Sequence, residues 1–433
     1  MTISDDLTPA ARHADASIDA NVDVAAVQRR TLRLLFATQV VGGVGVSVSL
    51  SVGALLAADI AGTSVSGLAL SSAVVGAALL ALPATAIVQR GGRRPSLAAS
   101  YFVAAIGSSI IVMAAMRESI ALMFAGFFLF GGASAASMQA RYAAVDLAPP
   151  SLRGRQLSMI VWATTLGAVA GPHFAAVTGA SLAGYGVPAL AGPFVFSTAL
   201  FALAAVALLM LMRPDPAVIA RGVAAPGKPT DARPAGVGLR AALREVAAER
   251  SARVGVAAMA AGHLVMVGVM SMTPVHIRGA GHDAAETLRI VGIVLSVHIA
   301  GMYALSPVIG WLTDRVGRRP VIVVGLLLLI AACALAGTAG HGTARLAIAL
   351  MVLGTGWSCT IVAGSTLLSE SVPVHVRASA QGLSDAIMGM AGASAGALSG
   401  VIVDASGYPM LALIAALAAT PFVLLVTRPG RRP

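Results

Sequence analysis

The chain has few charged residues, few aromatic residues and almost no cysteine for its length of 433 residues. Charged side chains make up 11% of it and hydrophobic side chains 58%. Soluble domains are nearer one quarter charged, so this balance excludes an ordinary soluble protein. Apolar runs of about twenty residues recur along the chain, and each is long enough to cross a bilayer. The sequence therefore predicts an all-α polytopic membrane protein.

Cysteine and the common catalytic motifs are equally scarce. The two cysteines, Cys333 and Cys359, lie in apolar runs and form no C-x-x-C pair, which argues against a disulfide framework or a zinc knuckle. The sequence has no phosphate-binding G-x-x-x-x-G-K-[ST] loop, no H-E-x-x-H and no nucleophile elbow. We therefore expect neither an enzyme nor an ATP-driven pump, and no permanently bound cofactor.

Basic residues give the chain a net charge of +11, and all of them except Lys228 are arginines. They lie in short loops between apolar runs, as the positive-inside rule expects, whereas a nucleic-acid binder would gather them on one soluble face. The loops after the second, fourth, eighth and tenth spans carry "RGGRR", "SLRGR", "DRVGRRP" and "VHVR", whereas those after the first, fifth and eleventh carry no Lys or Arg. The four basic loops and both termini are therefore predicted to be cytoplasmic, and no nucleic-acid partner is expected.

Twelve apolar spans are predicted, in two groups of six. The break between the groups is rich in proline and arginine and reads as a linker, helical in part from Leu239 to Glu249. The expected organisation is a cytoplasmic tail at 1–31, a six-helix half at 32–212, a cytoplasmic linker at 213–252, a second six-helix half at 253–427 and a cytoplasmic tail at 428–433.

The two halves repeat each other. "QRGGRRP" at 89–95 corresponds to "DRVGRRP" at 314–320, and Asp146 and Arg153 correspond to Glu370 and Arg377. Two similar six-helix halves with a binding site between them are typical of secondary transporters that work by alternating access.

The loop "GWLTDRVGRRP" at 310–320 resembles the loop signature of the major facilitator superfamily, G-x-L-a-D-R-x-G-R-R. The resemblance implies the major facilitator fold with 12 transmembrane helices. It also implies a charge latch between helix ends, formed by Asp314, Arg315, Gly317, Arg318 and Arg319. In the first-half copy Thr85 replaces the first glycine and Gln89 replaces the aspartate, so only the second-half latch is expected to be intact.

The seventh and eighth spans carry stripes of methionine and histidine. Met259, His263, Met266 and Met270 are spaced four, three and four residues apart, so they fall within roughly 60° of one another on a helix. His298 and Met302, four apart on the next span, also share a face. Met266 and His298 both lie within about 3 Å of the predicted midplane, so the two stripes can meet.

These stripes have two interpretations. Methionine fills gaps in apolar helices, so the stripes can be ordinary packing. Thioethers combined with imidazole also suit Cu(I), and these two spans contain no carboxylate for a hard divalent ion. A histidine at the midplane needs a partner or must stay neutral, which favours a functional role.

The motifs M-x-x-x-M and H-x-x-x-M in these spans resemble those of CcoA-type copper importers, a branch of the same superfamily. The resemblance implies a copper importer of the bacterial cytoplasmic membrane, with copper, as Cu(I), for substrate and Met266, Met270, His298 and Met302 as its ligands. Met259, His263, His173 and Cys359 are carried as additional metal or cavity residues. We expect the protein to be a monomer in the bilayer.

An alternative function is proton-coupled export of amphipathic small molecules. "GAVAGPH" at 167–173 resembles the G-x-x-x-G-P signature of proton-coupled antiporters, which makes the proton a candidate partner. Against it, the first span has no acidic residue and the fourth has none near its centre.

Asp385 is the one acid well inside an apolar span, and such a carboxylate indicates function. The alternative that we favour is a pair with Arg141 or a loop arginine that closes the cytoplasmic gate. Arg141, Asp146 and Arg153, and in the second half Glu370 and Arg377, are expected to belong to a gating network. Gln39 and Gln139 either face the central cavity or join helices by hydrogen bonds.

Overall fold

The computed structural model describes residues 23–149, 152–224, 239–373 and 376–427, and every regular element in these ranges is a helix. The first half contains the following elements: α2 (Val24–Ala61), α3 (Thr63–Gly91), α4 (Arg93–Arg117), α5 (Ile120–Phe130), α6 (Gly132–Ala143), α7 (Arg153–Ala170), the 3-10 turn η2 (Gly171–His173), α8 (Phe174–Ala183) and α9 (Gly192–Leu211). The first helix thus begins inside the predicted N-terminal tail.

The linker and the second half follow as α10 (Pro216–Ala224), α11 (Leu239–Ala248), α12 (Arg250–Arg278), α13 (Ala284–Tyr303), α14 (Ser306–Val316), α15 (Arg318–Gly337), α16 (Thr343–Ser371) and α17 (Arg377–Thr427). The helix predicted for the linker at 239–249 is present as α11. The linker residues 225–238 and the tails at 1–22 and 428–433 lie outside the described residues.

The spans agree with the predicted membrane fold. In the described ranges, ten helical segments are long and apolar enough to cross a membrane. The last of them joins two helices across a kink at Gly407, where φ is 79°. The broken helix α7–η2–α8 lies between the fourth and fifth of these segments, so the described chain contains a series of twelve.

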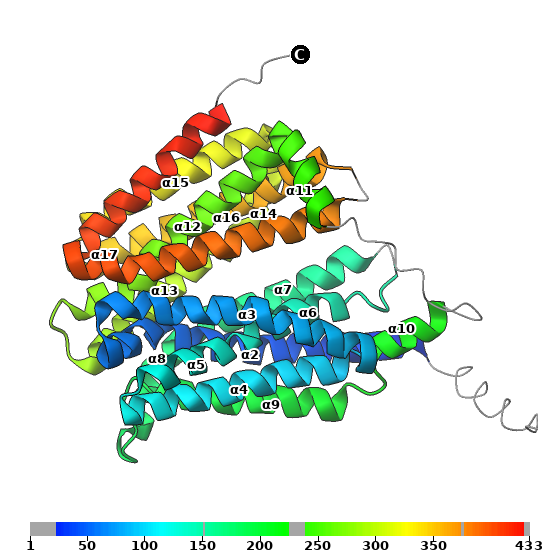
Figure 1. Ribbon diagram of the computed structural model, residues 1–433, viewed down its shortest axis with the longest axis horizontal. Coiled ribbons are helices and arrows are strands. Elements are labelled where there is room, and N and C mark those ends of the chain that lie inside the picture. Colours follow the sequence, from blue (N-terminus) through cyan, green and yellow to red (C-terminus); the bar gives the residue numbers. More distant parts are fainter. Residues whose placement is uncertain (1–22, 150–151, 225–238, 374–375, 428–433) are drawn as a thin grey trace, which may run out of the picture.

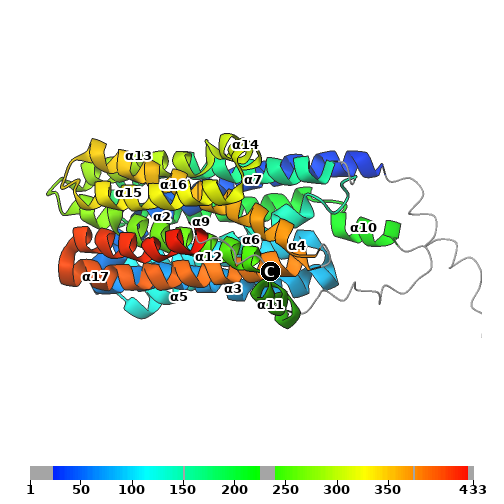
Figure 2. The same ribbon diagram turned by 90° about the horizontal axis from the view of Figure 1, so that it is seen from above.

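The two halves lie side by side along the length of the bundle (Figure 1). We call the end that carries α10 and α11 the linker end, and the opposite end, where α2 meets α3 and α12 meets α13, the far end. Figure 1 shows the ribbons of the two halves close together at the far end and diverging toward the linker end. Figure 2 shows the bundle from a second side, with α10 projecting beyond the linker end.

Contacts between the halves gather from the middle of the bundle to the far end. Near the far end, the Arg278 guanidinium forms an ion pair with Asp59. The Ser71 hydroxyl donates to the Ala393 carbonyl at 2.7 Å, and the Ser296 hydroxyl donates to the Val169 carbonyl at 2.9 Å. These bonds join α2, α3 and α7 of the first half to α12, α13 and α17 of the second.

Glycine allows the two closest of these helices to touch. A Cβ atom on Gly67 of α3 would lie 1.9 Å from the carbonyl oxygen of Gly396 on α17. A Cβ on Gly400 would lie 2.5 Å from the Thr63 carbonyl oxygen. The backbones of α3 and α17 are therefore in contact at the far end, which larger residues would prevent.

Candidate functional site

A cavity of about 330 Å3 lies between the two halves and is lined by both. From the first half it takes residues of α2, α4, α6 and α7, and from the second half residues of α12 and α13. Its volume is within the range of about 300–1,000 Å3 that is common for small-molecule sites. Its position between the halves is where alternating-access transporters bind their substrates.

The second-half wall of the cavity is rich in sulfur. Met266 and Met270 of α12 and Met302 of α13 all line it, beside Ile299 and Tyr303. Met266 and Met302 are buried, and Met270 is half-buried. Three of the four residues predicted as metal ligands therefore face one cavity. Met266 and Met270 share this wall because positions four apart lie on one helix face, and α13 adds Met302.

His298, the fourth predicted ligand, does not line the cavity. Its side chain is fully buried, and its Nδ1 atom lies 2.7 Å from the Leu350 carbonyl oxygen of α16. A carbonyl can only accept, so Nδ1 carries the proton and Nε2 carries the lone pair of the neutral ring. Nε2 is buried and has no hydrogen-bond partner. The structure thus separates His298 from the three methionines, but leaves it as an imidazole with an unused lone pair.

The four additional candidates also lie away from the cavity lining. The Nδ1 atom of His263 accepts a hydrogen bond of 3.1 Å from the Trp357 indole, and Met259 is buried near Ser384. Cys359 is buried against Gly325 in the second half. His173 of η2 is exposed. His263, Met259 and Cys359 therefore have packing roles in this conformation.

The first-half wall carries a hydrogen-bonded cluster of polar side chains among apolar ones such as Val46, Leu50 and Met138. The Tyr101 hydroxyl donates to Oε1 of Gln39 at 2.8 Å. The Gln39 amide donates to the hydroxyls of Ser137 at 2.8 Å and Thr164 at 3.1 Å. All four residues line the cavity. Gln39 therefore meets both expectations, because it faces the cavity and also joins α2 to α4, α6 and α7.

Two charged residues lie toward the linker end of the cavity. Arg141 of α6 lines the cavity, and its guanidinium interacts electrostatically with Asp385 of α17 and with Tyr303. Both Arg141 and Asp385 are exposed in this conformation. They belong to different halves of the bundle, α6 in the first and α17 in the second.

The second-half charge latch joins α15 to α14 and α16. The Arg318 guanidinium donates to both oxygens of Glu370, at 2.9 and 2.6 Å, and lies 3.4 Å from Asp314. Gly317 between α14 and α15 has a φ of 106°, a backbone conformation that residues with a Cβ atom rarely adopt. Arg319 donates to Ser251, and the Arg315 guanidinium stacks over Trp311.

The expectation that only the second half has a latch is wrong. Arg93 of α4 donates to both oxygens of Asp146, at 2.8 and 3.1 Å, and to Gln139 at 2.8 Å. Arg93 and Asp146 occupy the places of Arg318 and Glu370 in the repeat, so the same bidentate pair is present in both halves. Arg377 is exposed at the start of α17, and the Arg153 side chain lies outside the described residues.

An acid from elsewhere in the chain takes part in the first-half latch. Asp215, just before α10, accepts hydrogen bonds from the backbone amides of Arg93 at 3.1 Å and Arg94 at 2.7 Å. It therefore caps the N-terminus of α4. Gly92, with a φ of 96°, passes so close to this carboxylate that a Cβ would lie 2.4 Å from it. Sequence reasoning missed Asp215 because it is distant in the chain and lies in the linker.

Comparison with known proteins identifies the family. The Major Facilitator Superfamily profile matches residues 35–294 and 283–433. The chain belongs to the major facilitator superfamily. Two MFS-type transporters of Bacillus subtilis, YdeG and YddS, both uncharacterized, are 39% and 36% identical to it over 89% and 90% of this chain and 88% of each relative. The riboflavin transporter RfnT of Brucella anthropi is 25% identical over 94% of this chain and 98% of the relative.

Solved structures agree with this membership. The structure of the nucleoside transporter NupG matches with a TM-score of 0.73 at 17% identity, over 93% of this chain and 100% of that chain. A D-xylose–proton symporter has a TM-score of 0.66 at 20% identity, with 90% and 96% covered. The protein is therefore a multi-pass secondary transporter of this superfamily rather than an enzyme.

Proposed function

We propose that the protein imports copper, as Cu(I), across a bacterial cytoplasmic membrane by alternating access. The observation that carries the proposal is the convergence of Met266, Met270 and Met302 on one cavity between the halves. Three thioethers are soft donors that suit Cu(I) and bind Mg2+, Ca2+ or protons poorly. Neutral ligands also hold a monovalent ion weakly enough to release it. Copper here is cargo and not a resident cofactor.

His298 would complete the ligand set. Ligating histidines usually donate their other ring N–H to a carbonyl or carboxylate, and the Leu350 carbonyl has this role toward Nδ1. Nε2 is the free donor atom, one helical turn from Met302. For Nε2 to reach the ion while Nδ1 keeps its bond to Leu350, α13 and α16 must move together when the halves close around the cargo.

The orientation of the protein in the membrane follows from charge. Arg93, Arg94, Arg318 and Arg319 all lie at the linker end, which the positive-inside rule assigns to the cytoplasm together with both termini. The conformation described here is then closed to the outside by the far-end contacts. Closure of the linker end would bring Arg141 and Asp385 together as the cytoplasmic gate. One chain contains both halves, so we propose that a monomer carries out this cycle. A proton is a candidate for the coupled ion.

Copper accumulation in cells starved of copper tests the proposal. Met266→Leu, Met270→Leu and Met302→Leu keep the side-chain volume but remove the sulfur, and His298→Gln removes the imidazole. Each is expected to reduce accumulation to the level of cells without the transporter. Met259→Leu is the matched control, because Met259 lies on the same helix but outside the cavity, and it should accumulate copper normally. Normal uptake in all four ligand variants at equal protein levels would contradict the proposal.

A second candidate is transport of a hydrogen-bonding organic solute. The polar cluster of Gln39, Tyr101, Ser137 and Thr164 favours it, because amide and hydroxyl groups are poor Cu(I) ligands. The similarity to a riboflavin transporter agrees with it. Uptake of labelled riboflavin that Gln39→Leu abolishes, with no copper phenotype in Met266→Leu, would support this candidate over copper import.

A further inference from the structure

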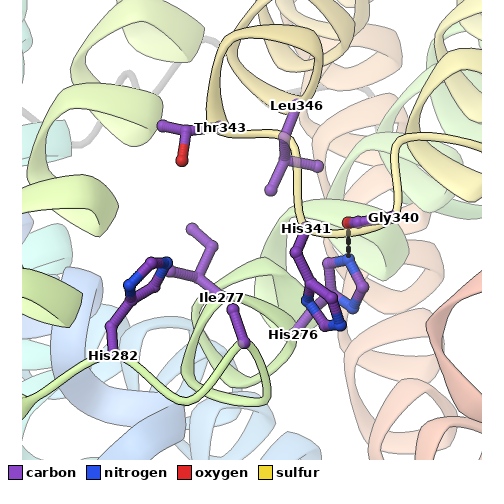
Figure 3. A pocket seen from close by; sticks show the side chains of 8 residues that line it. His276, Ile277, His282, Gly340, His341, Thr343 and Leu346 are labelled. Carbon is purple, nitrogen blue, oxygen red and sulfur yellow. Dashed lines mark hydrogen bonds between the residues drawn. The ribbon is translucent and has the colours of Figure 1, made fainter.

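The cavity between the halves is far larger than a single metal ion needs. Its volume is about 330 Å3, whereas about 10–15 Å3 accommodates a water molecule, and a copper ion is no larger than water. A cavity at the far end, lined by His276, His282 and His341, shows the contrast, because its volume of about 10 Å3 has room for about one water-sized particle (Figure 3). A bare ion on the methionine wall would leave most of the larger cavity to water, so its size favours a cargo with an organic body.

The charge of the cavity lining also disfavours a cation alone. Of the described residues that line the cavity, only Arg141 is charged, and none of them carries a carboxylate. The thioethers of Met266, Met270 and Met302 are neutral, so a Cu(I) ion bound to them would add a second positive charge. Like charges repel more strongly in a low-dielectric interior than in water. The lining therefore favours a cargo that brings a negative charge of its own.

The Arg141 guanidinium is available to bind an anion. It interacts electrostatically with Asp385, but none of the ion pairs between described residues includes it. The hydroxyl of Tyr303, from the other half, also interacts electrostatically with this guanidinium. The Tyr303 ring lies edge-on against Trp357, with the centroids 5.8 Å apart. A guanidinium and a phenol hydroxyl thus lie together toward the linker end of the cavity, and both groups donate hydrogen bonds to carboxylates.

The polar cluster suits the organic body of such a cargo. The Gln39 amide and the hydroxyls of Ser137 and Thr164 line the cavity and are hydrogen-bonded to one another. Amides and hydroxyls are poor Cu(I) ligands, so a bare ion gives this cluster no role. A hydroxyl that accepts one hydrogen bond can still bond to an organic molecule, because it has a second lone pair and a proton. The cavity therefore offers separate surfaces for a metal, for polar organic groups and for an acid.

We propose that copper occupies this cavity as the complex of a small organic carboxylate. The three methionines bind the ion, and a soft donor atom of the organic ligand takes the coordination place that His298 does not reach in the conformation described here. Arg141 and Tyr303 bind the carboxylate, which offsets the positive charge of the lining. The inference rests on the proposed function, because copper must be the cargo.

Three thiols of similar size test the charge of the complex. Mercaptoacetate, 2-mercaptoethanol and cysteamine all bind Cu(I) through a thiolate, but they carry a carboxylate, a hydroxyl and an ammonium group. The purified full-length protein is reconstituted in liposomes, and the uptake of copper and of carbon-14 in each thiol is measured together, less the uptake by protein-free liposomes. We expect copper to enter from mercaptoacetate about tenfold faster than from 2-mercaptoethanol, the effect of one charge-assisted hydrogen bond, and most slowly from cysteamine. Carbon-14 should enter with the copper.

Variants show whether Arg141 sets the preference for the anionic thiol. Arg141→Gln should abolish this preference, and Arg141→Lys should keep part of it. Asp385→Asn removes the other member of the proposed gate but leaves the guanidinium, so it should keep the full preference even where all three rates fall. Arg289→Gln is the matched control, because it removes an exposed arginine of α13 that does not line the cavity. It should change neither the rates nor the preference.

The outcomes separate this inference from the proposed function. Equal copper rates from the three thiols, or copper that enters without carbon-14, would overturn the inference and leave copper import in place. A preference that survives in Arg141→Gln, or that Asp385→Asn also loses, would overturn the assignment of the anion site to Arg141. Carbon-14 uptake that needs no copper would contradict copper import, and no copper uptake from any thiol would overturn both.

Discussion

At the far end the two halves are bonded to each other, whereas at the linker end the strongest bonds lie within each half. The far end has an ion pair between Asp59 and Arg278 and direct backbone contact between α3 and α17. The linker end has the two latches, Arg93–Asp146 and Arg318–Glu370, each confined to its own half. Bonds within a half can survive a rocking motion, but bonds between halves must break. The far end is therefore where the conformational equilibrium is set.

The largest effect is expected from Gly67→Leu. Its side chain would meet the Gly396 backbone, which cannot yield as a side chain can, so the far-end contact must open. Overpacking of this kind costs about 1–3 kcal/mol, enough to lower the population of this conformation about tenfold. A cysteine introduced at Ser66 should then react faster with a membrane-impermeant maleimide added from outside.

Gly184→Leu is the matched control, because a Cβ there has open space around it. It should leave labelling of the Ser66→Cys background unchanged. Equal labelling of the Gly67 and Gly184 variants would show that the α3–α17 contact does not hold the far end closed.

The first-half latch should contribute more to stability than the second-half latch, although its sequence motif is the less complete of the two. Arg93 and Asp146 are only 14% and 17% exposed, while Arg318 and Glu370 are 26% and 51% exposed. Asp146→Asn leaves a mostly buried guanidinium without its partner and should cost about 2 kcal/mol. Glu370→Gln should lower the melting temperature of the purified protein less. A larger loss for Glu370→Gln would reverse the comparison.

The Asp215 cap should have a moderate effect. Asp215→Ala removes the acceptor for two amides at the start of α4, and loss of such a cap costs about 1 kcal/mol. Asp314→Ala is the comparison in the other half. The Asp314 carboxylate is 76% exposed, and its one ion pair, with Arg318 at 3.4 Å, is weakened by solvent. Thermal unfolding should show a clear shift for the first variant and almost none for the second.

The smallest effect is expected from the far-end ion pair itself. Asp59 and Arg278 are about half exposed, and such pairs contribute about 0–1 kcal/mol. Asp59→Asn should raise maleimide labelling at Ser66→Cys only slightly, and the exchange Asp59→Arg with Arg278→Asp should restore it. A shift as large as that of Gly67→Leu would mean that charge, rather than backbone packing, closes this end.

Much of the architecture could be predicted from the sequence. Length and hydropathy identify the spans. A segment that crosses a bilayer must pair its backbone N–H and C=O groups within a helix and cover that helix with apolar side chains. Helical spacing then put Met266, Met270 and Met302 on faces that could meet, and the structure has all three on one cavity. The exact ends were less accessible, as the early start of α2 at Val24 illustrates.

Other features depended on contacts between distant segments. His298 lies only one turn from Met302, yet its ring reaches the Leu350 carbonyl of α16, because a buried N–H must find an acceptor. Asp215 caps a helix that begins 122 positions earlier in the chain. The sequence by itself determined which segments form apolar spans and which faces they offer. Only the tertiary structure decided which hydrogen-bond partners the buried polar atoms find. Water is absent from the interior, so each atom bonds with whatever partner the packing brings near.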